Sequence, residues 1–319
     1  MGGVAAAWPL AVRAQQQSKI PRVGVLWHAG SAQEEGPNFR ALIEGFNALG
    51  YVDGQNIKFE HRFPNEIPDR FKALAAELVV SNVDVLVSVG TVTAPYAKNA
   101  TTTIPVVLTV APDPVATNLV DSLAKPGGNV TGITIFASEL AGKRLEVLKD
   151  SIPGLLRVGL LVNPNALLAR PYINESQAAA AKLELTLQTF EARSVDEIEL
   201  AFDRMAEADM QAVSVMADSL FFQGRMILPK VALARRLGTC VFSRETFEPG
   251  ALMSYGPDIL AVIRRTAVYV DKILKGAKPA ELPVEQPTRF QFFISSKTAK
   301  ALGITIPGAV LARADEVIE

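Results

Sequence analysis

The residue types that most enzymes use for nucleophilic or metal chemistry are scarce in this chain. Its 319 residues include two histidines, His28 and His61, and one cysteine, Cys240. The chain therefore offers few residues from which a Ser-His-Asp triad or a multi-histidine metal site could be built. Cys240 lies in an apolar run, as buried thiols typically do, and a single cysteine forms neither an intrachain disulfide nor a cysteine-based zinc cluster. We expect no metal and no other cofactor.

Polar and aromatic side chains instead follow the apolar runs along the chain. In open parallel sheets ligands bind beyond the carboxyl ends of the strands, so residues that follow predicted strands are the candidates for a binding site. They are Trp27, His28, Ser31, Gly90, Thr91, Thr93, Thr109, Asp113, Phe136, Asn163, Asn165, Asp218, Arg244, Glu245 and Tyr255. This mixture of hydroxyls, amides, isolated acids and aromatic rings suits a small polar ligand with a carboxylate and an amine better than a phosphate.

The charged and hydroxyl candidates each have two interpretations. Thr91 and Thr93 precede a predicted helix, where free backbone N–H groups attract an anion or where one threonine simply caps the helix. Asp113 and Asp218 are candidates for binding an ammonium group, and the alternative for each is a turn or a helix cap. His28 either donates a hydrogen bond to the ligand or is a satisfied surface histidine.

The aromatic candidates leave a similar choice. Trp27, Phe136 and Tyr255 either stack on an aromatic or aliphatic ligand or complete a hydrophobic core near the ends of strands.

Other classes of function find little support. Lys and Arg number 32 and Asp and Glu 33, so the formal net charge of -1 does not favour a nucleic-acid partner. The chain has no G-x-x-x-x-G-K-[ST], no G-x-G-x-x-G after its first apolar run and no G-x-S-x-G, which disfavours nucleotide-dependent enzymes and hydrolases of those types. Because no segment beyond the amino terminus holds roughly eighteen uninterrupted apolar residues, we expect no direct membrane insertion.

The elements that must position the candidates alternate between β-rich runs and amphipathic stretches. Apolar residues recur at three- and four-residue spacing over residues 37–49, which predicts a helix with one buried face. Strands are predicted at 22–27, 56–60, 83–89, 104–109, 133–136, 157–162, 184–190, 212–216, 239–242, 251–255 and 290–294. Helices are predicted from Pro68, over 93–100, 138–150, 170–182, 195–208 and 222–237, and from Pro257 to Gly276. This alternation predicts an α/β fold with helices on both faces of parallel sheets.

The strands and helices alternate in two successive series, one in each half of the chain, and together they hold too many strands for one sheet. We therefore predict two doubly wound parallel-sheet lobes joined by a multi-strand hinge. Residues 20–134 and 252–286 are assigned to the first lobe, and residues 135–251 and 287–319 to the second. If the lobes face each other, the carboxyl ends of both sets of strands line one cleft.

Residues 1–19 are predicted to be the remnant of an export signal and a leader. An apolar stretch ends in Val12-Arg13-Ala14, with small residues like those that precede a secretory cleavage site, although the usual positive segment before it is missing. No cysteine follows the predicted cut, which disfavours a lipid anchor. We therefore expect a soluble, exported, periplasmic protein; the alternative is a frayed tail without function.

Short motifs spread over the whole chain resemble those of a large bacterial family, the periplasmic substrate-binding components of ABC transporters, which includes tryptophan- and tyrosine-type binders. They are GYVDGQN (50–56), ATTTIP (100–105), DPV (113–115), PGGNVTG (126–132), AGKRL (141–145), VNPN (162–165), LMSYG (252–256), ILKGAKP (273–279) and LARADEVI (311–318). The resemblance implies the type I periplasmic-binding fold, with two lobes around a cleft and a three-segment hinge.

The resemblance also implies a solute receptor rather than an enzyme. We expect it to capture an amino acid or a related carboxylate, aromatic ones included, in the cleft and to dock on the membrane permease of an ABC transporter. A ligand-sensing module that regulates another protein is the alternative, because the same lobes occur in repressors and receptors. An enzyme on the same scaffold is a third hypothesis, which turnover of the bound compound would establish.

Overall fold

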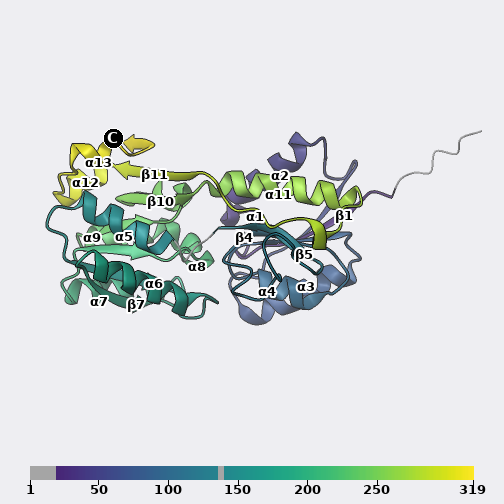
Figure 1. Cartoon of the computed structure of the whole chain (residues 1–319), viewed down its shortest axis with the longest axis horizontal. Coiled ribbons are helices and arrows are strands. Elements are labelled where there is room, and N and C mark those ends of the chain that lie inside the picture. Colours follow the sequence, from purple (N-terminus) through teal and green to yellow (C-terminus); the bar gives the residue numbers. More distant parts are fainter. Residues whose placement is uncertain (1–18, 136–139) are drawn as a thin grey trace, which may run out of the picture.

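The computed structural model describes residues 19–135 and 140–319, which form two α/β lobes side by side (Figure 1). The predicted leader, apart from Lys19, lies outside the described residues, and so does Phe136. Figure 1 shows one lobe around the strands β1 to β5 and the other around β6 to β12. This arrangement confirms the predicted fold class of two lobes built on parallel sheets.

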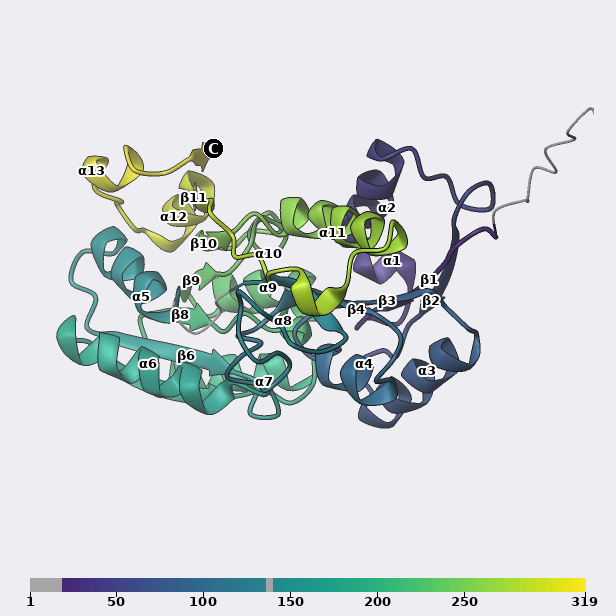
Figure 2. The same ribbon diagram turned by 45° about the vertical axis from the view of Figure 1, so that its right-hand side comes forward.

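The first lobe holds a five-stranded, wholly parallel sheet in the order β2-β1-β3-β4-β5. Its strands are β1 (Arg22–Leu26), β2 (Lys58–Arg62), β3 (Val85–Val89), β4 (Val106–Ala111) and β5 (Val130–Thr134). Its helices are α1 (Ala32–Glu35), α2 (Pro37–Ala48), α3 (Pro68–Val80), α4 (Ala94–Ala100), α11 (Ile259–Leu274) and the 3-10 turn η2 (Pro279–Glu281). Helices α2 and α11 cover one face of the sheet, and α3 and α4 cover the other (Figure 2).

The second lobe holds a seven-stranded sheet in the order β12-β11-β10-β9-β8-β6-β7. Its strands are β6 (Arg157–Val162), β7 (Thr186–Glu191), β8 (Ala212–Val215), β9 (Gly238–Val241), β10 (Met253–Pro257), β11 (Phe290–Ser295) and β12 (Glu316–Ile318). Its helices are α5 (Leu140–Ser151), α6 (Ala169–Lys182), α7 (Glu197–Glu207), α8 (Ser219–Gln223), η1 (Gly224–Met226), α9 (Leu228–Ala234), α10 (Arg244–Phe247), α12 (Ser296–Leu302) and α13 (Gly308–Leu311). Strand β11 runs antiparallel to β10.

The two sheets repeat one strand order. The series β7-β6-β8-β9-β10 in the second lobe has the same order as β2-β1-β3-β4-β5 in the first. In such a sheet the strands that come first and third along the chain are neighbours, and the winding direction reverses between them. Ligands bind in the crevice beyond the carboxyl ends of these two strands. The reversal lies between β1 and β3 in the first lobe and between β6 and β8 in the second.

Two sequence predictions about the second lobe are wrong. Residues 252–257 were assigned to the first lobe, but β10 pairs with β9 and β11 and so belongs to the seven-stranded sheet. The chain returns to the first lobe only at α11, whose amino end is capped by Asp258. The single helix predicted over 222–237 is divided into α8, η1 and α9. Pro229 explains part of this division, because proline is tolerated only in the first turn of a helix, where it lies in α9.

The chain passes between the lobes after β5, after β10 and again before β11. The last of these passages is anchored to the first lobe, where Glu285 forms a β-bridge with Ile133. The N–H of Glu285 donates to the carbonyl of Gly132 (2.9 Å) and its carbonyl accepts from Thr134 (3.0 Å). The segment is the yellow-green coil that crosses the middle of Figure 1.

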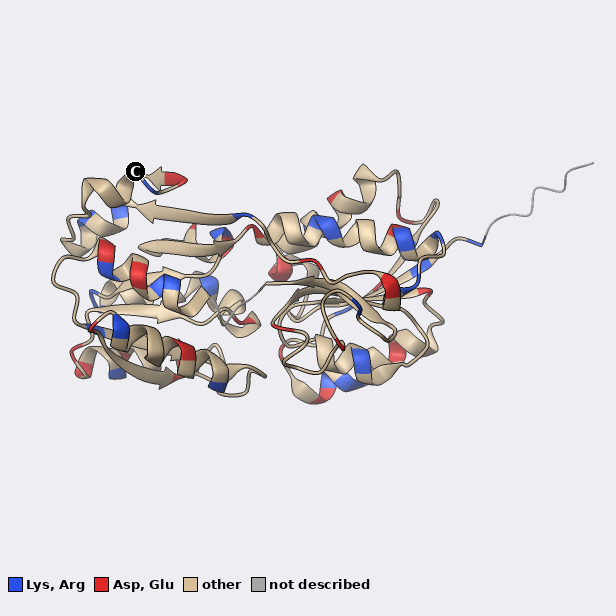
Figure 3. Cartoon of the chain, in the orientation of Figure 1, with Lys and Arg blue, Asp and Glu red and all other residues tan. Residues whose placement is uncertain are grey.

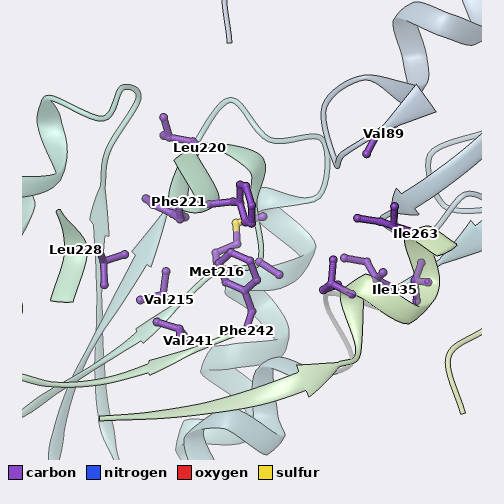
Figure 4. Close-up of a cluster of buried hydrophobic side chains, with 14 of the residues drawn as sticks. Val89, Ile135, Val215, Met216, Leu220, Phe221, Leu228, Val241, Phe242 and Ile263 are labelled. Atoms are coloured by element: carbon purple, nitrogen blue, oxygen red, sulfur yellow. The ribbon is translucent and has the colours of Figure 1, made fainter. Parts of the chain in front are cut away.

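Apolar side chains from strand ends and neighbouring helices of the two lobes belong to one buried cluster, shown in Figure 4. Val89 and Ile263 come from the first lobe, and Met216 and Phe242 come from the second. Charged residues of both signs are distributed over the helices of both lobes (Figure 3). None of the helices within 19–135 and 140–319 is long and apolar enough to cross a membrane.

Candidate functional site

A cavity of about 390 Å³ lies between the lobes, beyond the carboxyl ends of the strands. Its lining in the first lobe includes Glu66, Pro68, Phe71, Thr91, Pro95 and Tyr96. Its lining in the second lobe includes Asn163, Asn165, Leu168, Arg193, Met216 and Asp218. Apolar rings and prolines thus share the cavity with two carboxylates. A smaller pocket of about 30 Å³ adjoins it, sharing Thr91, Ala217 and Asp218 with the cavity.

Four predicted site residues line the main cavity: Thr91, Asn163, Asn165 and Asp218. Thr91 follows β3, Asn163 and Asn165 follow β6, and Asp218 follows β8, so all four come from the strands at which the winding of the two sheets reverses. Two more predicted residues, His28 and Gly90, line the smaller pocket.

Hydrogen bonds between Thr91 and the segment 218–219 join the lobes at the cavity. The Thr91 hydroxyl donates to Asp218 Oδ2 (3.2 Å), and the Thr91 N–H donates to the hydroxyl of Ser219 (3.1 Å). In return the Ser219 N–H donates to Thr91 Oγ1 (3.1 Å). All three residues are buried. The lobes are therefore closed on each other at this point.

Asp218 is fixed by groups from both lobes. Its Oδ1 accepts hydrogen bonds from Asn163 Nδ2 (2.9 Å) and from the N–H of Leu220 (3.1 Å), the second of which caps α8. Burial raises the pKa of Asp218, while the hydrogen bonds from Asn163, the Leu220 N–H and Thr91 act in the opposite direction. The cap predicted as an alternative role is thus present, and it coexists with a place on the cavity wall.

His28 lies at the end of β1 between two glutamates. Its Nδ1 is 2.9 Å from Glu66 Oε1, and its Nε2 is 3.3 Å from Glu35 Oε2. Burial lowers the pKa of His28, but the charge of Glu35 and the hydrogen bond to Glu66 outweigh it and raise the pKa to about 9. His28 therefore carries a proton at neutral pH: its Nδ1 donates a hydrogen bond to Glu66, and its Nε2 makes an ion pair with Glu35 without a hydrogen bond. It is a buried histidine and not a surface one, since it is 3% exposed.

This histidine makes the stability of the protein depend on pH. The folded state keeps the His28 proton up to a pKa of about 9, whereas the unfolded chain releases it near pH 6.5. The stabilisation is therefore complete below about pH 6.5 and is lost as the pH rises through 9. We expect the free energy of unfolding in urea to fall by about 1.5 kcal/mol between pH 6.5 and 8, with a smaller fall in His28→Gln. An equal fall in the free energy of unfolding of the wild type and of His28→Gln would contradict the conclusion that His28 causes the pH dependence.

Trp27 lines neither pocket, and of its two predicted roles the structure shows packing in a hydrophobic core. Its side chain is fully buried between Phe39 and Phe63, with ring centroids 5.4 and 6.2 Å away, and its Nε1 donates to His61 Nδ1 (3.1 Å). Successive side chains of a strand point to opposite sides, so Trp27 enters the core while His28 turns toward the cleft.

Two predicted residues hold turns instead of lining either pocket. Ser31 caps α1 by accepting the N–H of Glu34 (3.2 Å). Asp113 Oδ1 accepts the N–H groups of Val115 (3.1 Å) and Ala116 (3.0 Å), which is the turn interpretation of this aspartate.

The hydroxyls of Thr93 and Thr109 are used within the first lobe. Thr93 Oγ1 is 2.6 Å from the Ser88 hydroxyl and makes no side-chain cap for α4. Thr109 is hydrogen-bonded to Thr266 on α11. Both threonines are fully buried, so they tie helices to the sheet and are not part of the cavity lining.

The last three predicted residues lie in the second lobe away from both pockets. Tyr255 stacks on Phe290, with ring centroids 6.4 Å apart. Arg244 pairs with Glu316 (2.8 Å). Glu245 is buried on α10, and burial raises its pKa. Tyr255 lies within β10 and the other two residues follow β9, but none of the three lines either pocket.

Glu66 is the main residue of the cavity that the sequence prediction missed. Glu66 follows β2, and Thr91 and Asp218 were selected because they follow predicted strands, so the same criterion applies to Glu66. Phe71 and Tyr96, whose stacked rings (5.0 Å between centroids) line the cavity, belong to the starts of α3 and α4. Their apolar character and helical spacing are typical of core residues, which is why the sequence does not mark them.

The fold and the closed cleft define a two-lobed binding protein, and comparison with known proteins gives its family. The chain belongs to the family of ABC transporter substrate binding proteins, whose model matches residues 36–318. The resemblance predicted from the sequence motifs is thereby confirmed, and with it a solute-binding function.

Three relatives are similar over most of their length. A tyrosine-binding protein of Clostridioides difficile (strain R20291) is 26% identical over 264 residues, which cover 82% of this chain and 75% of that protein. A conserved domain protein from Vibrio cholerae is 29% identical with a TM-score of 0.87, over 94% of this chain and 100% of that one. An ABC domain from Streptococcus pneumonia, solved in complex with L-Trp, is 28% identical with a TM-score of 0.86, over 93% and 99%.

Proposed function

We propose that this protein binds an amino acid with an aromatic side chain in the cavity between its lobes. The observation that supports this most is the composition of the cavity, which combines an apolar wall of prolines and aromatic rings with the carboxylates of Glu66 and Asp218. An aromatic side chain fits the first feature, and an ammonium group complements the second. The relatives that carry tyrosine-binding and L-Trp-bound descriptions agree with this ligand class.

Binding is proposed to act through closure of the lobes. A ligand that touches both walls binds the closed form more tightly than the open form, and so shifts the population toward closure. The hydrogen bonds between Thr91 and residues 218–219 form only when the lobes meet, so they contribute to the same equilibrium. The closed protein would then dock on the permease of an ABC transporter in the periplasm, without chemical change of the ligand.

The test is thermal unfolding against a panel of amino acids, sugars and purines. At about a hundredfold above its dissociation constant a ligand adds about 2.7 kcal/mol to the folded state, which raises the midpoint by several degrees. We expect L-tryptophan, L-tyrosine or L-phenylalanine to produce this shift and to be recovered unchanged.

Sugars serve as the control, because they lack the ammonium group. A shift with a sugar or a purine and none with any amino acid would contradict the proposed ligand class. Conversion of the bound amino acid into a product would contradict the proposed role as a receptor.

A further inference from the structure

The backbone around Glu66 is held in an unusual conformation beside the cavity. Asn65 and Glu66 both have left-handed backbone angles, with φ of 61° and 53°. The turn is fixed to the loop after β1, because the N–H of Asn65 donates to the carbonyl of Ala29 (3.1 Å) and the N–H of Glu66 donates to that of His28 (2.9 Å). Residues other than glycine adopt this conformation at a cost, and such residues concentrate at functional sites.

The carboxylate of Glu66 is fixed through one oxygen. His28 Nδ1 donates to Glu66 Oε1 (2.9 Å), and His28 is itself held by Glu35, whose side chain is fully buried. Glu35 Oε1 accepts the backbone N–H groups of His28 (3.1 Å) and Ala29 (3.0 Å). Among the described residues, the hydrogen bond to the Glu66 carboxylate uses Oε1 alone, and Glu66 lines the cavity with its side chain 16% exposed. Its second oxygen is therefore the one left for a ligand.

Asp218 differs from Glu66 in this respect. Both of its oxygens already accept hydrogen bonds from the protein, Oδ1 from Asn163 and the Leu220 N–H and Oδ2 from Thr91. One of these partners lies in the opposite lobe. Asp218 is thus engaged in joining the lobes, although the sequence alone makes it the natural candidate for an ammonium group.

The charges around the cavity favour a cation near Glu66. The carboxylates of Glu35, Glu66 and Asp218 surround protonated His28, and of these three only Glu35 also interacts with the charge of Arg225, so the acids outnumber the cations. Arg193 also lines the cavity, but its guanidinium is paired with Glu191 (2.6 Å). An ammonium group beside Glu66 would reduce the remaining repulsion between carboxylates.

We propose that Glu66 binds the ammonium group of the ligand, that His28 and Glu35 are positioning residues for Glu66, and that Asp218 holds the lobes together. This inference rests on the proposed function, because it assigns the contact within the same cavity. It adds Glu66 as a ligand-binding residue and explains why His28 is buried beside it.

The test compares an amino acid with its deaminated analogue in each variant by calorimetry. The pairs are L-tryptophan with indole-3-propionate and L-tyrosine with 3-(4-hydroxyphenyl)propionate. Loss of a buried charge-assisted contact typically weakens binding by about 100-fold, so the wild-type protein should prefer the amino acid by at least about that factor. In Glu66→Gln the preference should fall below about tenfold, and in His28→Gln it should also fall. In Asp218→Asn both members of a pair should weaken by a similar factor.

Two variants check that the result reports the contact and not a loss of folding. Glu66→Asp keeps the charge and should retain most of the preference for the amino acid. Glu207→Gln, an exposed glutamate on α7, should match the wild type. If wild-type protein binds the amino acid and Glu66→Gln keeps the full preference, the assignment of Glu66 is overturned alone. If wild-type protein binds no amino acid, the proposed function is overturned, and the assignment with it.

Discussion

Replacing Gly45 with leucine is expected to lower the free energy of unfolding by about 3 kcal/mol, near the upper end for an overpacked core. Gly45 lies on α2 where that helix crosses α11, and a Cβ at this position would come within 2.4 Å of the Arg264 carbonyl oxygen and 2.9 Å of its Cα. Both are backbone atoms, so no side-chain rotation relieves the clash and the two helices must separate. The gain in helix propensity from glycine to leucine, about 1 kcal/mol at most, is smaller than this cost.

Urea unfolding of both proteins measures the difference. Gly308→Leu is the matched control, because a Cβ at Gly308, in the short helix α13, has no atom within 4 Å. We expect its stability to stay within about 0.5 kcal/mol of the wild type, as for most surface substitutions. Equal urea midpoints for Gly45→Leu and wild type would show that α2 and α11 do not approach as closely as the structure has them.

The second large effect concerns ligand affinity. Asp218→Ala is expected to weaken binding of the aromatic amino acid by at least about 100-fold, or about 2.7 kcal/mol. The substitution removes the acceptor for Thr91, and this contact exists only when the lobes meet. It also leaves Asn163 and the Leu220 N–H without their partner, but both lie in the same lobe as Asp218, so this loss of about 1–3 kcal/mol per group lowers the stability of the open and closed forms alike and does not change the affinity.

The informative control is Asp113→Ala, since the sequence makes both aspartates candidates for the ammonium group. Asp113 holds a turn, so its loss is expected to change the dissociation constant by less than about threefold, under about 0.7 kcal/mol. Calorimetric titration of Asp113→Ala and Asp218→Ala with the same amino acid measures both dissociation constants and shows which aspartate affects binding. Weaker binding in Asp113→Ala than in Asp218→Ala would place the site elsewhere.

The α/β architecture could be predicted because periodicity depends on local sequence. The helix predicted from Pro68 begins there in α3, and the strand predicted over 157–162 has those bounds in β6. The choice of sheet is different. The apolar run that forms β10 looks the same whether it pairs in the first or the second lobe, and only the tertiary pairing with β9 and β11 decides it. The antiparallel direction of β11 is likewise absent from the pattern.

The site was predictable to the extent that it follows the strand ends. Thr91, Asn163 and Asp218 were found because parallel strands bring their carboxyl ends to one edge of each sheet. For Trp27 the sequence left ligand stacking and core packing open, because adjacent side chains leave a strand in opposite directions and the sequence does not say which of them faces the cleft. Glu66 follows β2, so the same criterion would have selected it, but the left-handed backbone at Glu66, unlike that at Asn65, is not one that its residue type favours.

The position of α11 in the chain has a consequence for synthesis. This helix packs on α2 and β4 of the first lobe, yet it follows β6 to β10 of the second lobe in sequence. As the ribosome releases the chain, the five strands of the first sheet emerge well before the helix that covers one of its faces. The first lobe therefore completes its core only after most of the second lobe exists. An unfinished chain exposes an apolar sheet face in the meantime, which is the kind of surface that chaperones hold.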